Sequence, residues 1–520
     1  MRLRFSFKRI AKHRLFAALF TCFTCVAHAQ VYDVTAFGAK GDGMTDNTTS
    51  IQQAIDQCAV TGGKVYFPSG IFLSGTLYLK SHVTLHLTEK ATLLGQTDVS
   101  KYPHLSSGIP FFGEEWAKQA LIFCKNAEYV SIEGNGTIDG QGASFVIKTN
   151  KKPERYKNRP YLLWFAGSKN ITIKGVHLRN SAFWMQHYLG CENLLIDGIS
   201  IWNHSNKNND MIDIDGCKNV IVSNVNGESD DDGVTLKSTS RLITENVSIT
   251  NCVLSSHCNA IKMGTESTGG FRNITISNCV IKPSSQLATI YGLPAGTSGI
   301  SLEVVDGGIM ENVAISNIAM DGPEVPLFIR LGNRARKHTD TAATPAPGII
   351  RNIQLSNITA INAGITSSSI TGVSYAQVQD VTLSNIAITT KGGGTAKDMD
   401  IKVEELENEY PEATMFGKLP SYGLYVRHVN GLQVSGISLR YNGNEQRFPV
   451  VLSSVKQFSF SGLNVQSDKN TTAVISLNNS SNGFITNTIH HYPAKSFIRK
   501  DAQSVNIVTT NNYTPAIKTR

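Results

Sequence analysis

The chain has 520 residues, of which 41% are hydrophobic and 17% are charged, and its formal net charge is +8 with a pI of about 8.9. This hydrophobic content excludes a disordered chain. Six cationic and no acidic side chains lie in residues 1–29, so residues 30–520 carry only +2, which argues against a nucleic-acid partner.

The first 29 residues have the pattern of a secretory signal peptide. A basic segment precedes the apolar stretch Leu15–Val26, and Ala27-His28-Ala29 fits a small-x-small cleavage site. The apolar stretch is too short to span a membrane. We therefore expect a secreted or periplasmic protein without a membrane span, cleaved near Ala29.

A short phrase recurs along the chain: asparagine, alternating apolar residues, a small polar residue, then asparagine or glycine. It starts at Asn170, Asn193, Asn219, Asn246, Asn273, Asn312 and Asn352, in steps of 23, 26, 27, 27, 39 and 40 residues. Such periods are typical of solenoids, and Val, Ile and Thr alternating between Gly, Asn and Ser favour strands and turns. We predict one all-β domain over residues 30–520, a right-handed parallel β-helix in which the repeated asparagines form turns or ladders.

Three polar clusters fall on consecutive repeats. They are Asn208-Asn209-Asp210-Met211-Ile212-Asp213, Asp230-Asp231-Asp232-Gly233 and Ser256-His257-Cys258. Strands of adjacent coils lie about 4.8 Å apart, so we expect Asp210 beside Asp231 and Asp232, with His257 one coil further along the same face. Paired carboxylates at a fixed separation are what hydrolysis of a glycosidic bond requires.

A second strand column can be aligned by its apolar residues. Its inward positions are Ile212, Val234, Ile261 and Ile300, then Ile214, Leu236, Met263 and Leu302. The outward positions are Asp213, Thr235, Lys262 and Ser301, then Asp215, Lys237, Gly264 and Glu303, with Arg330 one coil beyond Glu303. Alternate residues of a strand share a face, so this alignment predicts which side chains meet across coils.

Other interpretations of these residues stay open. Adjacent strand residues point to opposite faces, so Asp231 and Asp232 share a cleft only on an irregular backbone, which Gly233 would permit; otherwise Asp230 and Asp232 form the pair. The three aspartates also suit calcium. Lys237 either pairs with Asp215 or contacts substrate.

Several further features are less specific. Trp184 is either a packed aromatic residue or a platform for a sugar ring, and residues 401–420 form an acidic insertion that is capable of helix formation. Seven cysteines follow residue 29, without a metal-type CxxC pair, and Cys252 and Cys279 hold equivalent repeat positions that favour stacked thiols over a disulfide. We predict no metal and no cofactor.

The chain resembles the polygalacturonase-type glycoside hydrolases of family 28, in their bacterial branch, which degrade pectin. Besides the three clusters, the resemblance rests on Phe37–Asp46 with Ile51–Ile55, Gly134–Gly142, Arg159-Pro160, and Asn180–Trp184 with His187. It implies an inverting hydrolase in which Asp231 is the general acid. It further implies that Asp210 and Asp232 hold and activate the water, and that His257 tunes the pair.

The chain departs from the family pattern at identifiable positions. Asn209 replaces a threonine, Gly233 a cysteine, and Ser256 and Cys258 two glycines. The family's Arg-Ile-Lys strand, which binds the galacturonate carboxylate, is Ser301-Leu302-Glu303 here. The predicted substrate-binding residues are Asn208, Lys237, Lys262 and Arg330. We expect Lys262 to contact an acidic sugar, and a mixed or branched pectin such as rhamnogalacturonan to be preferred over homogalacturonan.

Three classes of function remain at this point. The first is an inverting hydrolase of pectic polysaccharide, acting as a monomer. The second is a polysaccharide lyase or uronate epimerase on the same fold, and the third is a non-catalytic β-helix that binds glycan. A lyase would release unsaturated uronide in a calcium-dependent reaction, whereas a binding protein would create no new reducing ends.

Overall fold

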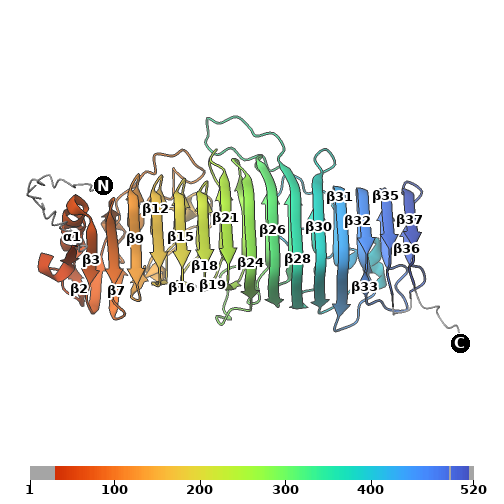
Figure 1. Ribbon diagram of the computed structural model, residues 1–520, viewed down its shortest axis with the longest axis horizontal. Helices are drawn as coiled ribbons and strands as arrows, with labels where there is room; N and C mark the ends of the chain where they lie inside the picture. The colour runs from red at the N-terminus through yellow and green to blue at the C-terminus, as the bar shows by residue number, and fades with distance from the viewer. Residues whose placement is uncertain (1–29, 491–493, 514–520) are drawn as a thin grey trace, which may run out of the picture.

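The computed structural model describes residues 30–490 and 494–513, so the predicted signal peptide lies outside the described residues. The described chain winds into a long stack of parallel strands (Figure 1). Every pairing between the named strands is parallel, and strands in the interior of the stack pair with their equivalents one coil before and after. The prediction of a right-handed parallel β-helix is confirmed.

The strands form three columns along the stack. The first begins with β1 (Val31–Asp33), β3 (Gly63–Phe67), β6 (Val83–Leu87), β9 (Glu128–Gly134), β12 (Lys169–Lys174), β15 (Glu192–Asp197), β18 (Lys218–Ser223) and β21 (Thr244–Thr250). The second begins with β2 (Asp42–Asp46), β4 (Gly70–Ser74), β7 (Ala91–Gly95), β10 (Thr137–Asp139), β13 (His177–Arg179), β16 (Ser200–Asn203), β19 (Asn226–Ser229) and β22 (Val253–Ser256).

The third column carries the polar clusters. It contains β5 (Leu77–Leu79), β8 (Ala120–Lys125), β11 (Tyr161–Ala166), β14 (Gln186–Leu189), β17 (Ile212–Asp215), β20 (Val234–Ser238), β23 (Asn259–Ser267), β25 (Ser298–Val304), β27 (Val325–Leu331), β29 (Ser368–Thr371), β34 (Ile475–Asn478) and β36 (Ile498–Lys500).

Later coils have longer strands that pass through a corner of the stack. They are β24 (Phe271–Ile281), β26 (Ile309–Asp321), β28 (Ile349–Ala363), β30 (Val378–Thr390), β31 (Ser421–Tyr441) and β32 (Phe448–Ser461), followed by β33 (Asn464–Val465), β35 (Ser481–Thr486) and β37 (Val505–Thr510). β24, for example, pairs with both β21 and β22, so it belongs to the first and second columns at once.

The register of the third column is the one predicted from the apolar pattern. Ile212 pairs with Val234, Val234 with Ile261, and Ile261 with Ile300, and all four side chains are buried in the core. The polar residues between these apolar residues also pair as predicted, because a shared register fixes both faces of each strand. The column places Lys262 beside Ser301, in agreement with the sequence alignment.

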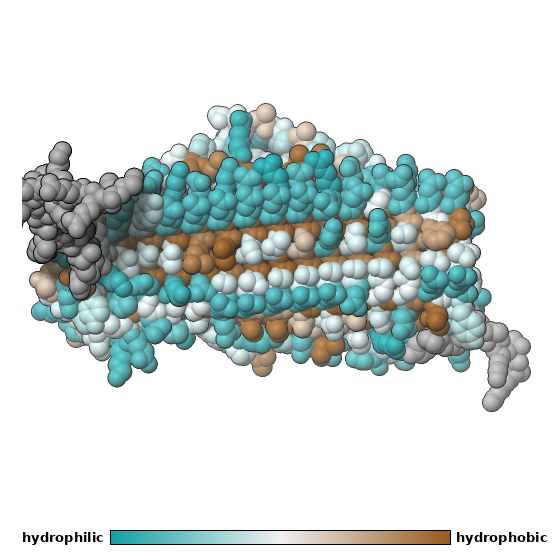
Figure 2. All heavy atoms as spheres, viewed as in Figure 1, coloured by the Kyte–Doolittle hydropathy of each residue, from teal (hydrophilic) through white to brown (hydrophobic). Residues whose placement is uncertain are grey.

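The repeated asparagines form a ladder on the outside of the stack. Asn170, Asn193, Asn219, Asn246, Asn273, Asn312 and Asn352 all have φ between 54° and 58°. From Asn193 onward, each side-chain amide donates to the amide oxygen of the equivalent asparagine one coil earlier, at 2.6–3.1 Å. Asparagine tolerates this left-handed backbone, which makes it suitable for the corner of a coil. Rows of hydrophilic and hydrophobic side chains accordingly run along the stack (Figure 2).

Helical segments are few among the described residues. The α-helix α1 (Thr48–Thr61) lies at the N-terminal end of the stack (Figure 1) and buries Ile51, Ala54, Ile55 and Cys58. The 3-10 turns are η1 (Val34–Phe37), η2 (Val99–Lys101), η3 (Gly142–Ser144), η4 (Glu154–Tyr156) and η5 (Ala396–Asp400). None of the helices in the described ranges is long and apolar enough to cross a membrane.

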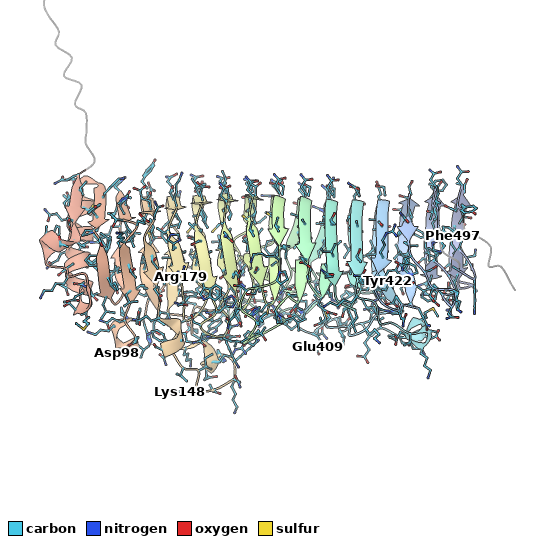
Figure 3. The ribbon with its side chains drawn as sticks, turned by 90° about the horizontal axis from the view of Figure 1, so that it is seen from below. Asp98, Lys148, Arg179, Glu409, Tyr422 and Phe497 are labelled. Atoms are coloured by element: carbon cyan, nitrogen blue, oxygen red, sulfur yellow. The ribbon has the colours of Figure 1, made fainter. Side chains whose placement is uncertain are left out.

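Loops inserted between strands gather on one long side of the stack. Asp98, Lys148 and Glu409 come from three such insertions and all lie on this side (Figure 3). The sequence suggested that residues 401–420 could form a helix, but this fully described segment contains only turns, bends and irregular chain. It instead lies over the third column, where Tyr410 contacts Lys262 and the backbone of Glu405 contacts Arg330.

Candidate active site

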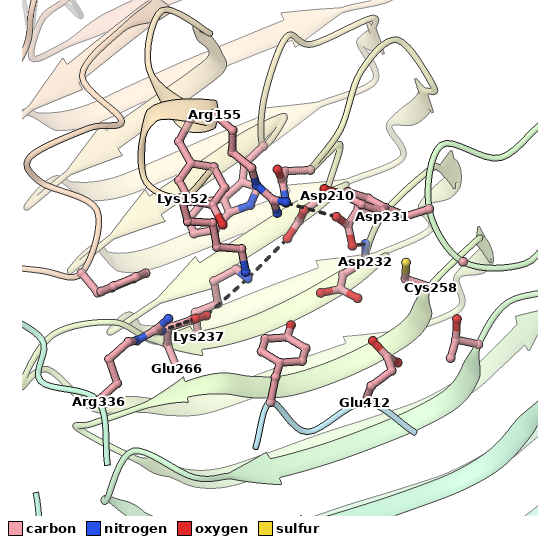
Figure 4. A pocket seen from close by; sticks show the side chains of 18 of the residues that line it. Lys152, Arg155, Asp210, Asp231, Asp232, Lys237, Cys258, Glu266, Arg336 and Glu412 are labelled. Carbon is pink, nitrogen blue, oxygen red and sulfur yellow. Dashed lines mark hydrogen bonds and ion pairs between the residues drawn. The ribbon is translucent and has the colours of Figure 1, made fainter. Parts of the chain in front are cut away.

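A cleft of about 600 Å³ opens over β17, β20 and β23 on the side of the stack that carries the insertions. Among the predicted site residues, Asn208, Asp210, Asp231, Asp232 and Lys237 line it (Figure 4). The three carboxylates come from segments that immediately precede or begin strands of neighbouring coils, so the register of the stack brings them together.

Asp231 and Asp232 both reach the cleft because the backbone between β19 and β20 is irregular. Residues 230–233 form bends rather than strand. A Cβ atom on Gly233 would lie 2.3 Å from the carbonyl oxygen of Ala260, so this position requires glycine because of close approach to the next coil, and its φ is not left-handed. The alternative pair of Asp230 and Asp232 is therefore not the pair that faces the cleft.

Asp230 and His257 instead point away from the cleft. The Asp230 carboxylate accepts hydrogen bonds from the backbone amides of Ile290 and Tyr291. His257 is fully buried, with its Nδ1 2.8 Å from Asp230 and its Nε2 2.8 Å from the carbonyl oxygen of Gln286. The expectation that His257 lies on the cleft is wrong, and Cys258 lines the cleft in its place. The aspartates face two directions, so they form no shared calcium cage.

Lys237 is held by acidic side chains. Its Nζ lies 3.3 Å from Asp210, 3.4 Å from Asp213 and 3.7 Å from Glu266, and it also stands over the Trp184 ring at 4.3 Å. The proposed pair with Asp215 is wrong, because Asp215 binds His187 and Thr239. Lys237 thus fixes the position of Asp210. Trp184 is 8% exposed and packed among aromatic residues, although its ring also forms part of the cleft wall.

Lys262 lies beneath Asp232 instead of facing the cleft. Its Nζ is 2.9 Å from the Asp232 carboxylate, 3.4 Å from the Tyr410 hydroxyl and 4.0 Å from Glu303. Asp232 also accepts a hydrogen bond from Asn259 at 2.7 Å. Lys262 therefore orients one of the three cleft carboxylates, which differs from the contact with an acidic sugar that the sequence suggested.

Arg330 is buried and contacts backbone carbonyl groups. It is 1% exposed, and its guanidinium donates to the carbonyl oxygens of Gly372, Glu405 and Leu406. It does not line the cleft. The predicted register, with Glu303 beside Arg330, is confirmed, and the side chain anchors the 401–420 insertion.

Several cleft residues were missed by the sequence analysis. They are the cationic residues Lys152, Arg155 and Arg336, the acidic residues Glu266 and Glu412, and the aromatic residues Phe112, Trp116, Tyr156, Tyr291 and Tyr410. Most come from loops outside the repeat phrase, so no periodic signal marked them. The one available signal was the acidic character of residues 401–420, which contribute Tyr410 and Glu412.

Burial changes the acidity of the cleft carboxyls. It raises the pKa of Asp231 to about 6, and the charge of Asp232 adds to the effect. It also raises the pKa of Glu412 to about 7, although Lys262 opposes this shift. The pKa of Asp210 lies well above its ordinary value because of burial and the neighbouring Asp213. The cleft therefore combines carboxyl groups whose pKa is shifted toward neutrality with lysines that hold two of these groups, Asp210 and Asp232, in place.

Comparison with known proteins places this geometry in a family. The profile of the Glycosyl hydrolases family 28 matches residues 59–408. A probable polygalacturonase of Vitis vinifera is 28% identical over 473 residues, covering 83% of this chain and 91% of the relative. An exo-poly-alpha-D-galacturonosidase of Dickeya chrysanthemi is 25% identical over 396 residues, covering 66% of this chain and 65% of that protein.

Solved structures show the same fold. The structure of a family 28 exopolygalacturonase from Yersinia enterocolitica superimposes with a TM-score of 0.67 at 21% identity, over 83% of this chain and 79% of the other. The family match spans the three cleft carboxylates and more than half of the chain. Of the classes that the sequence left open, the comparisons support a hydrolase, and the chain belongs to the glycosyl hydrolases of family 28.

Proposed function

We propose that this protein hydrolyses α-linked, galacturonic-acid-containing pectic polysaccharide or oligosaccharide with inversion of configuration. The observation that carries the proposal is the convergence of Asp210, Asp231 and Asp232, from neighbouring coils, on one cleft. Inverting hydrolysis uses one carboxylic acid to protonate the leaving oxygen and one carboxylate to activate water. The names of the relatives from Vitis vinifera and Dickeya chrysanthemi support galacturonate as the sugar.

The environments of the three carboxyls suggest their roles. Asp231, with a pKa raised to about 6 by burial and by Asp232, is the general acid. Asp232 accepts hydrogen bonds from Lys262 and Asn259, which leaves it oriented as the base for the attacking water. Asp210, held by Lys237, positions that water. Asn208 contacts Asp231 at 3.4 Å and completes this side of the site.

Two cations at the rim are suited to bind the sugar carboxylate. Lys152 and Arg155 both line the cleft, and among the described residues neither forms an ion pair with a carboxylate within 4.0 Å. Burial lowers the pKa of Lys152, and the positive charge of the nearby Arg155 lowers it further. An anionic partner would stabilise the positive charges of both side chains. They would thereby take over the role of the cations that are missing from the Ser301–Glu303 strand.

The absence of those cations bears on the choice of polymer. Ser301 and Glu303 are buried, and Glu303 binds Ser301 and Thr265. With fewer cations beneath the cleft than the family pattern supplies, we propose that mixed or branched pectin is preferred over homogalacturonan. We further propose that the protein acts as a secreted or periplasmic monomer.

A substrate panel tests the proposal. Purified protein is incubated with polygalacturonate, rhamnogalacturonan and xylogalacturonan, and new reducing ends are measured together with absorbance of unsaturated uronide. We expect reducing ends without unsaturated product, and NMR should show the β-anomer formed first from an α-linked substrate. Unsaturated product, or a first-formed α-anomer, would contradict the hydrolytic inverting mechanism.

The same panel tests the rim cations. Arg155→Ala should raise KM on acidic substrate, because the substrate carboxylate loses a charged partner. Lys174→Ala removes a lysine that lies on the first column, away from the cleft, and serves as the control. Equal KM values for the two variants would refute the assignment of the carboxylate to Arg155. Preference for homogalacturonan over every other polymer would refute the branched-substrate part alone.

A further inference from the structure

Three side chains outside the cleft occupy equivalent positions in consecutive coils. His204 follows the last residue of β16, Asp230 follows β19, and His257 follows β22. The residues before them, Asn203, Ser229 and Ser256, pair in register across the second column. The stack therefore superimposes an imidazole, a carboxylate and an imidazole, and ligand atoms from the three side chains lie within 4.8 Å of one another.

The cluster is buried. The side chains of His204, Asp230 and His257 are 3%, 1% and 0% exposed. The Asp230 carboxylate accepts hydrogen bonds from the amides of Ile290 and Tyr291 and is enclosed by protein. An ionised carboxylate in such an environment requires a compensating positive charge.

His257 is oriented as metal-binding histidines are. Its Nε2 lies 2.8 Å from the carbonyl oxygen of Gln286, which only accepts hydrogen bonds, so Nε2 carries the proton. In the neutral ring, Nδ1 then presents a lone pair toward Asp230 Oδ1, 2.8 Å away. Two lone pairs at that distance repel unless a proton or a metal ion bridges them. Metal-binding histidines commonly donate their other ring N–H to a backbone carbonyl, which fixes the tautomer.

His204 supplies an independent observation. Both of its ring nitrogens are buried without a hydrogen-bond partner, although one of them lies 3.8 Å from Asp230 Oδ1. Its ring packs between those of Trp202 and His257, at centroid distances of 4.7 and 4.9 Å. A buried imidazole without a partner is costly, and this one lies beside the Asp230 carboxylate.

We propose that His204, Asp230 and His257 form a structural site for a divalent transition metal, with Zn²⁺ as the preferred ion. Two imidazoles and one carboxylate are a ligand set typical of zinc, with bonds of about 2.0–2.2 Å. Ligand atoms around such an ion stand roughly 3.3 Å apart, a value between the 2.8 and 3.8 Å separations found here. The metal would give the His204 ring a partner, and it would bridge the lone pairs of His257 Nδ1 and Asp230 Oδ1.

The site would secure one wall of the cleft. Asp230 binds the amides of Ile290 and Tyr291, and His257 binds Gln286, so all three contacts hold the loop of residues 282–297 between β24 and β25. Tyr291, Gly292 and Leu293 of this loop line the cleft. A metal bound at the base of the loop would thus order a substrate-facing segment without touching substrate.

The test uses full-length protein without a polyhistidine tag, freed of metal by EDTA and then dialysed. Titration calorimetry with ZnCl₂ should give one ion per chain, and Co²⁺ should produce visible absorption bands of a nitrogen- and oxygen-ligated ion. His204→Phe retains an aromatic ring but cannot bind a metal. It should weaken binding at least ten-fold and abolish the cobalt bands, while the exposed-site control His104→Phe should match the wild type.

Thermal unfolding gives a second readout. An excess of Zn²⁺ should raise the Tm of the wild type and of His104→Phe, and leave that of His204→Phe unchanged. If circular dichroism shows that His204→Phe does not fold, His204→Asn replaces it. Wild-type protein that binds no Zn²⁺, or binds it equally well without His204, would overturn the proposal and leave a protonated His257 paired with Asp230.

Discussion

At the scale of single residues, Asp231 differs from Asp210 and Asp232 because it has no lysine partner. Asp210 is held by Lys237 and Asp232 by Lys262, whereas Asp231 contacts Asn208. Burial and the charge of Asp232 raise its pKa to about 6. These features fit the carboxyl that must carry a proton and deliver it to the leaving group.

This environment predicts the pH dependence of catalysis. A general acid works only in its protonated form, and Asp231 loses its proton as the pH rises through about 6. The value of kcat/KM should therefore fall about ten-fold per pH unit on the alkaline side of this pKa. A pH–rate profile with buffer controls measures it. Activity that stays constant between pH 6 and 8 would show that Asp231 does not act as the acid.

Lys262 gives a second prediction at this scale. Lys262→Met keeps the length of the side chain but removes the charge beneath Asp232, so it should lower kcat on the order of ten-fold or more with little change in KM. Lys174→Met, at the exposed pair with Asp197, is the matched control. A rise in KM on acidic substrate at unchanged kcat would instead support a direct contact between Lys262 and the sugar.

The sequence could predict positions in the strands but not what covers them. The register of Lys262 and Arg330 was correct, since apolar alternation fixes it. Their partners were not predictable, because Tyr410 and the backbone of Glu405 arrive from an insertion that lies more than 70 residues away along the chain. His257 was misplaced for a related reason, since its neighbour Gln286 belongs to a loop outside the repeat.

At the scale of elements, the asparagine ladder links one coil to the next. The Asn246 amide donates to Asn219 at 3.1 Å and accepts from Asn273 at 3.0 Å, while its own φ is 57°. Alanine at this position would lose both hydrogen bonds and would be strained by the left-handed backbone, whereas glycine would lose only the hydrogen bonds.

Comparison of two substitutions separates these effects. Asn246→Ala should destabilise the protein by about 1–3 kcal/mol, and Asn246→Gly by about 1 kcal/mol less. Chemical unfolding followed by circular dichroism gives the difference in midpoint. If glycine is as destabilising as alanine, the backbone conformation does not determine the choice of asparagine.

The 401–420 insertion shows where local propensity fails. Its glutamates and leucine are compatible with a helix, yet the segment has no regular secondary structure and its contacts are tertiary. Arg330 and Arg427 bind its carbonyl oxygens, and Tyr410 packs over Lys262 at 5.7 Å from the ring centroid. Backbone groups bound to arginines are unavailable for a helix, so tertiary contacts override the sequence preference.

At the scale of the whole molecule, a stack of strands requires a protected end. The helix α1 buries Ile51, Ala54, Ile55 and Cys58 against the first coils, and it lies at the N-terminal end of the stack (Figure 1). Exposed strand edges promote pairing between molecules, so such a cap favours a separate, soluble solenoid. The periodic phrase predicted the stack, but α1 falls outside the phrase and was not predicted.

A charge placed under the cap tests this role. Ile55→Lys should detach α1, lower the Tm and promote self-association, because a buried unpaired charge is costly. Val60→Lys introduces the same side chain on the same helix at a position that is 83% exposed, and should behave as wild type. Light scattering coupled to size exclusion measures the mass. An unchanged mass and Tm for Ile55→Lys would show that the cap is dispensable.

Hydrolysis by the three cleft carboxylates predicts a large difference in rate between two aspartate variants. On the best substrate of the panel, Asp231→Asn should lower kcat/KM by at least about 100-fold while the fold is retained. Asp197→Asn, which alters a carboxylate on the first column beside Lys174, should leave the rate unchanged. Activity of Asp231→Asn close to that of the wild type would contradict the account.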